Sequence, residues 1–158
     1  MAAATIAGSS SLESQSQPKA DARTAVPDRG PRLDNDLVRE FVVAGHANLE
    51  KVKEMLAQQP ALLNATWDWG GGDWETALGG ASHMGNRPIA EYLLSQGARM
   101  DVFCAVMQGK TEIVKAFLAD DPKIANLKGP HGISLLRHAR AGKQEAIVAM
   151  LVERGAKD

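Results

Sequence analysis

Four segments of the chain share the same pattern of apolar and polar positions. Each segment runs from a small residue to a Leu nine positions later, and the four cover 47–56, 85–94, 109–118 and 142–151. Between 109 and 118 the apolar residues fall at i, i+1, i+4 and i+5, which makes one stripe on a helix. The pattern predicts four amphipathic helices, with stripes such as Ile113, Val114, Phe117 and Leu118, and Ile89, Ala90, Leu93 and Leu94.

A shorter, Ala-rich segment precedes each of these helices. These segments cover 37–45, 76–84, 102–108 and 134–141. Small residues allow two helices to approach closely, and a Gly between them supplies the positive φ that ends the first helix. We therefore expect four helix pairs with a core of Leu and Val, including Leu56, Leu78, Leu94, Val114, Leu118, Leu135 and Leu151.

The repeats resemble a known family in both helices. Residues 75–85 read ETALGGASHMG and resemble the ankyrin opening, in which Thr-Pro-Leu-His starts the first helix; residues 109–115, GKTEIVK, resemble its Gly-His-x-Glu-Ile-Val-Lys. Ala77 and Gly79 replace the Pro and His of that opening. The resemblance implies an all-α ankyrin-repeat solenoid, with units at about 36–65, 75–101, 102–125 and 133–158 and each unit packed only on its neighbours.

The intervals between the repeats are irregular. The anchor positions are 38, 24 and 33 residues apart. In ankyrin-like proteins a finger loop joins successive units, so the short interval predicts that the finger before residue 102 is missing. The long interval adds residues 66–75, TWDWGGGDWE, which hold all three Trp residues. Residues 126–132 form a Gly- and Pro-marked finger of ordinary character.

Composition and charge narrow the range of functions. The formal net charge of the 158 residues is -1, which disfavours nucleic-acid binding, and a single cysteine excludes an intrachain disulfide. No stretch approaches the length of a membrane span, so we expect a soluble, cytoplasmic chain, with a monomer favoured. We expect residues 1–35 to form a disordered leader. The alternative is an exported or periplasmic protein, if the apolar start is the remnant of an export signal.

The Trp-rich loop is the most unusual constellation in the sequence. Tryptophan is prominent at binding hot spots, but buried Trp more often serves packing, and both interpretations stay open. The neighbouring carboxylates predict an acidic edge, which either suits a basic peptide or is merely solvated. The candidate binding residues are Trp67, Asp68, Trp69, Asp73, Trp74 and Glu75, with Met107 and His131 added less securely.

Neither the histidines nor the cysteine predicts catalysis. No two of His46, His83, His131 and His138 have a local metal-ligand spacing, so we expect no metal and no cofactor. Cys104 lacks an activating neighbour and fits a small buried residue. The sequence favours a non-catalytic protein- or peptide-binding module that uses the concave helix and finger surface and the Trp-rich loop. The alternatives are a small enzyme with a pocket between the Trp loop and inner-helix histidines, or an inhibitor or immunity-type subunit. A tight cluster of His83, Asp73 and Glu75 around a cavity would favour the enzyme.

Overall fold

A computed structural model describes residues 29–158. The chain divides into two units, and the second, Arg32–Asp158, holds every described helix and strand. The predicted leader and export signal lie almost entirely outside the described residues. Within residues 29–158 no helix combines the length and apolar character that crossing a membrane requires.

The described chain is mainly helical, as the sequence predicts, and carries one small hairpin. The α-helices are α1 (Asn35–Ala47), α2 (Leu49–Gln58), α3 (Ala77–His83), α4 (Arg87–Ser95), α5 (Val102–Met107), α6 (Thr111–Asp120), α7 (Leu135–Ala141) and α8 (Glu145–Glu153). The strands are β1 (Thr66–Asp68) and β2 (Trp74–Thr76). Short 3-10 turns follow α2 and α6, and a third lies at Pro130–Gly132.

Polar caps explain where the first helix of each pair begins. The side chains of Asp34, Thr76, Asp101 and Ser134 each accept a hydrogen bond from the backbone N–H three residues later. Such a bond satisfies one of the free N–H groups at a helix N-terminus. The capping residue just before each first helix therefore determines where that helix begins.

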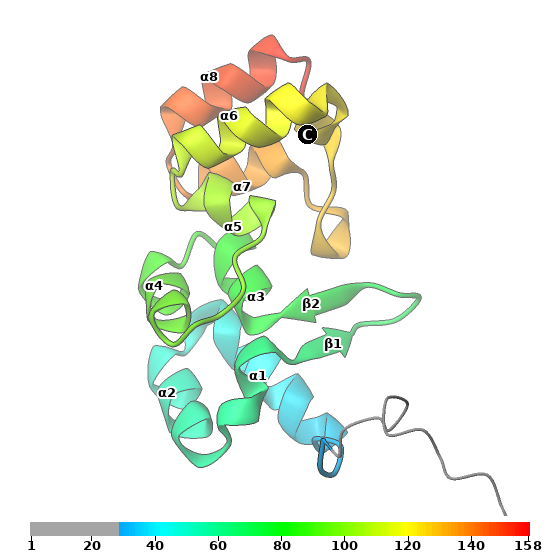
Figure 1. Ribbon diagram of the computed structural model, residues 1–158, viewed down its shortest axis with the longest axis vertical. Coiled ribbons are helices and arrows are strands. Elements are labelled where there is room, and N and C mark those ends of the chain that lie inside the picture. Colours follow the sequence, from blue (N-terminus) through cyan, green and yellow to red (C-terminus); the bar gives the residue numbers. More distant parts are fainter. Residues whose placement is uncertain (1–28) are drawn as a thin grey trace, which may run out of the picture. The chain divides into compact units, whose positions relative to one another are not determined.

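The eight helices form four antiparallel pairs. Each first helix (α1, α3, α5, α7) contacts its own second helix, and α1 contacts α3, α3 contacts α5, and α5 contacts α7 (Figure 1). The expectation that each unit packs only on its neighbours is wrong, because α7 also contacts α3. The physical reason is a close approach where the two helices end, because a Cβ atom at Gly85, just after α3, would lie 2.8 Å from the carbonyl carbon of Ala141 at the end of α7.

The core consists of two apolar clusters. The first is built mainly from α1 to α4, the second from α5 to α8, and α5 contributes to both. All but one of the predicted core residues are buried; the exception is Leu94, which is half-buried while its neighbour Leu93 is 0% exposed. Ile113 and Phe117 are 42% exposed, so the core-facing stripe of α6 is narrower than predicted.

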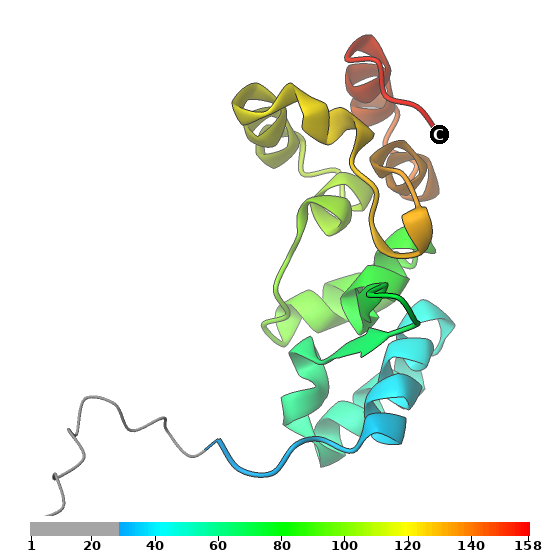
Figure 2. The same ribbon diagram turned by 90° about the vertical axis from the view of Figure 1, so that its right-hand side faces the viewer.

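The connections between the helix pairs differ as their lengths predict. Residues 96–101 join α4 to α5 without helix or strand, which confirms the missing finger. The Trp-rich loop is a two-stranded antiparallel hairpin, in which Trp67 pairs with Glu75. Residues 126–134 form the other finger, closed by a bridge between Lys128 and Ser134. Figure 2 shows both fingers on one side of the helices.

Candidate functional site

Three histidines and two carboxylates meet where the two fingers reach the first helices. His46 ends α1, His83 ends α3, His131 lies in the finger 126–134, and Asp73 and Glu75 come from the hairpin. Their donor atoms approach one another although the residues are up to 85 positions apart. We call these five residues the His–carboxylate cluster.

Glu75 lies at the centre of the cluster and is 1% exposed. Its Oε2 atom accepts a hydrogen bond from the Trp69 indole N–H at 2.9 Å. The Nε2 atoms of His46 and His131 each lie 3.4 Å from the same oxygen. Oε1 lies 3.1 Å from His83 Nδ1, but neither of these two atoms has a partner in hydrogen-bond geometry. A buried carboxylate is thus surrounded by imidazole nitrogens.

Helix geometry and a glycine position His46. Its Nδ1 atom lies 3.0 Å from the carbonyl oxygen of Val42, one turn earlier in α1. A Cβ atom at Gly80 would lie 2.8 Å from the His46 ring, closer than real Cβ contacts. The close approach of α3 to this ring therefore requires glycine at position 80.

Asp73 binds His131 and thereby joins the two fingers. The backbone N–H of His131 donates to Asp73 Oδ1 at 2.9 Å, and His131 Nδ1 lies 2.8 Å from Oδ2. His131 has φ 59, in the left-handed region. These contacts hold an uncommon backbone conformation and direct the other ring nitrogen toward Glu75.

The surroundings shift the pKa values of both carboxyl groups downward. Burial acts to raise the pKa of Glu75, but the neighbouring His83, His46 and Trp69 together lower it below its ordinary value. The backbone N–H of His131 lowers the pKa of Asp73, with a further contribution from the ring. Both groups are therefore carboxylates at neutral pH.

Comparison of the sequence with models of known families and with curated proteins gives no match. The chemistry of the cluster must accordingly be argued from its own geometry. His46, Glu75, His83 and His131 each offer one donor atom, and these atoms all lie within 4.8 Å of one another. Such a set could hold a metal ion, a role that was not expected from the local spacing of the histidines.

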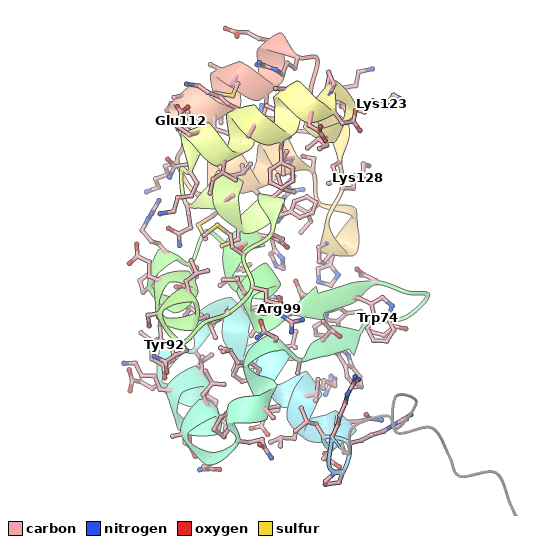
Figure 3. All side chains as sticks on the ribbon, viewed as in Figure 1. Trp74, Tyr92, Arg99, Glu112, Lys123 and Lys128 are labelled. Carbon is pink, nitrogen blue, oxygen red and sulfur yellow. The ribbon has the colours of Figure 1, made fainter. Side chains whose placement is uncertain are left out.

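The residues of the Trp-rich loop have different surroundings. Trp67 packs against the first core cluster, and Trp69 is 36% exposed. Trp74 is 59% exposed on the hairpin (Figure 3). Asp68 Oδ1 accepts from the N–H groups of Gly70 and Gly72 and so shapes the turn. Packing thus accounts for one Trp, whereas Trp74 remains available for contacts.

Two of the residues predicted at the site require correction. Met107 is 0% exposed and belongs to the first core cluster, so its side chain presents no surface to a partner. Glu75 is buried and therefore does not contribute to a solvated acidic edge. Cys104 is 0% exposed, which confirms its role in packing, and burial raises the pKa of its thiol to about 11.

Sequence reasoning missed His46 as a member of the cluster and considered His83 beside Asp73 and Glu75 only for the enzyme alternative. A signal for them exists in the repeat frame, because each lies in the last turn of a first helix and α1 contacts α3. Comparing the last turns of the first helices, rather than searching for local spacings, would have placed the two residues near each other, one position apart in the repeat frame.

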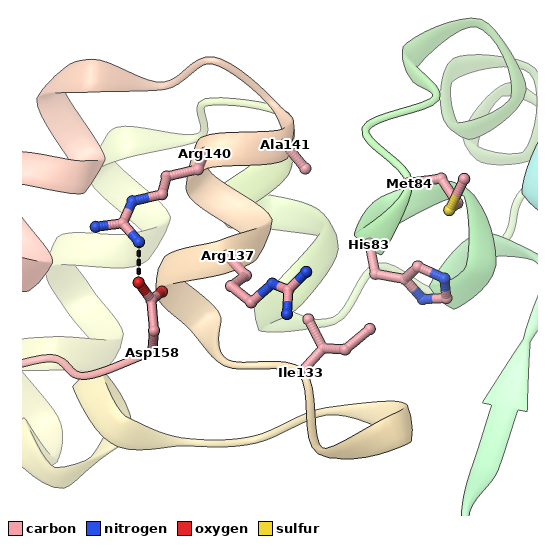
Figure 4. A pocket seen from close by; sticks show the side chains of 7 residues that line it. All are labelled: His83, Met84, Ile133, Arg137, Arg140, Ala141 and Asp158. Atoms are coloured by element: carbon pink, nitrogen blue, oxygen red, sulfur yellow. Dashed lines mark hydrogen bonds and ion pairs between the residues drawn. The ribbon is translucent and has the colours of Figure 1, made fainter.

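A pocket of about 610 Å³ lies beside the cluster and shares His83 with it. It is lined by His83, Met84, Ile133, Arg137, Arg140, Ala141 and Asp158. Figure 4 shows the Arg137 side chain extending from α7 toward the His83 side of the pocket, while Arg140 pairs with Asp158. The pocket is therefore basic at its α7 wall and has an imidazole on the opposite side.

The fourth histidine, His138, gives a pH-dependent prediction. Burial lowers the pKa of His138 below the ordinary value of 6.5, with its Nδ1 atom 2.8 Å from the Ser134 carbonyl. The unfolded chain therefore takes up the proton more readily, and stability falls as the pH drops below 6.5. When urea unfolding is measured as the pH is lowered below 6.5, the free energy of unfolding should fall less for His138→Gln than for the native chain. Equal losses in the two chains would contradict this assignment.

Proposed function

We propose that the chain is an ankyrin-type repeat module that binds a protein or peptide, without catalysis, through its two fingers. Support for the repeat type comes from the four helix pairs and the contacts between successive first helices. The sequence resemblance at 75–85 and 109–115 and the irregular finger spacing agree with this assignment.

One observation carries the proposal: the two fingers are joined, and two tryptophans of the hairpin, Trp69 and Trp74, are left exposed. Asp73 and His131, 58 residues apart, bind each other through two contacts. Trp74 exposes 59% and Trp69 36% of its surface beside this link. Tryptophan buries a large rigid area on binding at low conformational cost, which suits it to recognition.

The charged groups of the fingers indicate what kind of partner they could bind. Asp68 is engaged in the turn, Asp73 binds His131, and Glu75 is buried. A partner would therefore meet aromatic surface more than free carboxylates. We propose an apolar or amphipathic segment as the ligand, in place of the strongly basic peptide that the sequence alone suggests.

Site-specific crosslinking tests this proposal. A photoreactive phenylalanine analogue at Trp74, in the full chain in an extract of its native cells, should give a discrete crosslinked product. The matched control carries the same analogue at Val152, an apolar residue of α8 that is 51% exposed. The same products from both positions, or no product from Trp74, would contradict recognition by the hairpin. Because Trp74 is largely exposed, Trp74→Ala should change the free energy of unfolding by less than about 0.5 kcal/mol.

A small enzyme is the second candidate, and the shared His83 favours it. This imidazole belongs both to the cluster and to the basic pocket of about 610 Å³. The candidate nucleophiles nearby are poorly suited, since Cys104 is a buried thiol and the Ser82 hydroxyl donates to the Leu78 carbonyl. Hydrolysis of ester or phosphate-monoester substrates by the native chain, abolished in folded His83→Ala, would favour the enzyme over the binding module.

A further inference from the structure

Hydrogen bonds to outer groups fix the proton positions on two of the clustered histidines. His46 Nδ1 lies 3.0 Å from the Val42 carbonyl, and His131 Nδ1 lies 2.8 Å from an Asp73 oxygen. A carbonyl and a carboxylate oxygen only accept, so each Nδ1 must carry the proton and donate. In the neutral ring the Nε2 atom then bears a lone pair.

Both lone pairs face the same negatively charged oxygen. His46 Nε2 and His131 Nε2 each lie 3.4 Å from Glu75 Oε2. Two lone pairs and an anionic oxygen at this distance repel, unless a positive charge lies between them. Proton addition to both rings would place two cations around His83, whose ring centroid is 4.9 Å from that of His46 and 5.5 Å from that of His131. One shared cation removes the repulsion between the lone pairs and the carboxylate oxygen, and it does not place two positive charges next to each other.

The remaining ligand atoms also lack partners in hydrogen-bond geometry. Glu75 is 1% exposed, and its Oε1 atom is buried without a hydrogen bond. The Nδ1 atom of His83, 3.1 Å away, is also buried without a hydrogen bond. Unpaired buried polar atoms are rare because each carries an uncompensated desolvation cost. A bound ion would satisfy both atoms at once.

We propose that His46, Glu75, His83 and His131 bind one divalent transition-metal ion of the zinc type. Ligand atoms about 2.0–2.1 Å from a tetrahedral zinc lie about 3.3–3.4 Å from one another. The Nε2 atoms of His46 and His131 already lie 3.4 Å from Glu75 Oε2, and His83 Nδ1 lies 3.1 Å from Oε1 of the same carboxylate. The donor atoms of the four residues all lie within 4.8 Å of one another, so a bound ion would draw the wider pairs together. Imidazole nitrogens select zinc and its transition-metal neighbours over calcium and magnesium, which prefer oxygen ligands.

The surroundings of the four ligands resemble those of a metal site. Metal-binding histidines donate their second N–H to a carbonyl or carboxylate, as His46 does to Val42 and His131 does to Asp73. The Trp69 indole orients the Glu75 carboxylate in the same way. Four protein ligands leave no open tetrahedral position, which is typical of structural zinc. The ion would fasten both fingers to the ends of α1 and α3, a role beyond the proposed recognition of a partner.

Three variants test the ligands with little disturbance of the fold. Glu75→Gln keeps the shape and an acceptor for Trp69 but removes the charge. His131→Asn removes the imidazole at a residue with φ 59, a conformation that Asn tolerates. Asp73→Asn can keep the bond from the His131 backbone N–H, but its amide N–H₂ group would turn the ring to the other tautomer. His138→Gln is the control, because its ring lies outside the four ligands.

Titration calorimetry of the metal-free full chain with Zn²⁺ is the experiment, with folding of each variant checked by circular dichroism. We expect one Zn²⁺ per chain and a raised Tm for the native chain and for His138→Gln. Glu75→Gln and His131→Asn should bind at least about 100-fold more weakly, and Asp73→Asn about 10- to 100-fold more weakly. No saturable binding by the native chain, or unchanged affinity in the folded cluster variants, would overturn the proposal. If Glu75→Gln fails to fold, the variants at the exposed residue His131 and the half-buried residue Asp73 decide.

Discussion

Leu93→Ala is expected to lower the free energy of unfolding by about 2–5 kcal/mol, the usual cost of removing a buried leucine side chain. Leu93 is 0% exposed and lies in the first core cluster on α4. Folded domains in general have a small total stability, of about 5–15 kcal/mol, so the loss is large. Urea unfolding followed by circular dichroism measures it.

The neighbouring residue supplies the control for this prediction. Leu94 has the same side chain but is only half-buried, so Leu94→Ala should cost clearly less than Leu93→Ala. The sequence alone placed Leu94 in the core. If the two substitutions cost the same, or if Leu94→Ala costs more, the orientation of α4 against the first core cluster is wrong.

Gly45→Ala is expected to destabilise the chain by about 1–3 kcal/mol, the usual cost of overpacking. A Cβ atom at position 45 would lie 2.6 Å from the Cα atom of Ala77, so α1 and α3 would have to separate. Replacing Gly by Ala inside an unobstructed helix has the opposite sign and stabilises by up to about 1 kcal/mol. Thermal and urea unfolding of Gly45→Ala therefore test the contact between α1 and α3, because the sign of the stability change shows whether the contact is close.

The outcome bears directly on the repeat packing. A stabilised Gly45→Ala chain would show that the first two helix pairs do not approach closely at this residue. A destabilised chain would locate the strain at this contact, and because two of the three nearest atoms belong to the Ala77 backbone, Ala77→Gly should not relieve it.

The helices and most of the core could be predicted because their signals are local. Apolar spacing located both helices of each pair, and the residue intervals located the missing finger at 96–101. Leu94 was misplaced because adjacent apolar residues on a helix differ by a rotation that periodicity does not resolve. The contact between α3 and α7 depends on the close approach of Gly85 to Ala141, a matter of tertiary packing that the repeat pattern does not contain.

The candidate site was predicted only in part. The Trp-rich loop pointed to Asp73 and Glu75, and the Gly-Pro-His-Gly segment pointed to His131. His46 was missed and His83 was considered only for the enzyme alternative, because ligand spacing was sought along the chain while the site is assembled across it. Glu75 was taken for a solvated carboxylate, since nothing next to it in the sequence shows that three imidazoles surround it.

The central claim is that the ends of α1 and α3 and the two fingers form one site around Glu75. Diffraction at the zinc absorption edge from crystals of the Zn²⁺-loaded chain tests it most directly. We predict a single anomalous peak bonded to Nε2 of His46, Nε2 of His131, Nδ1 of His83 and a Glu75 oxygen, about 2.0–2.2 Å from each. A peak elsewhere, or none at the cluster in the loaded chain, would contradict the claim.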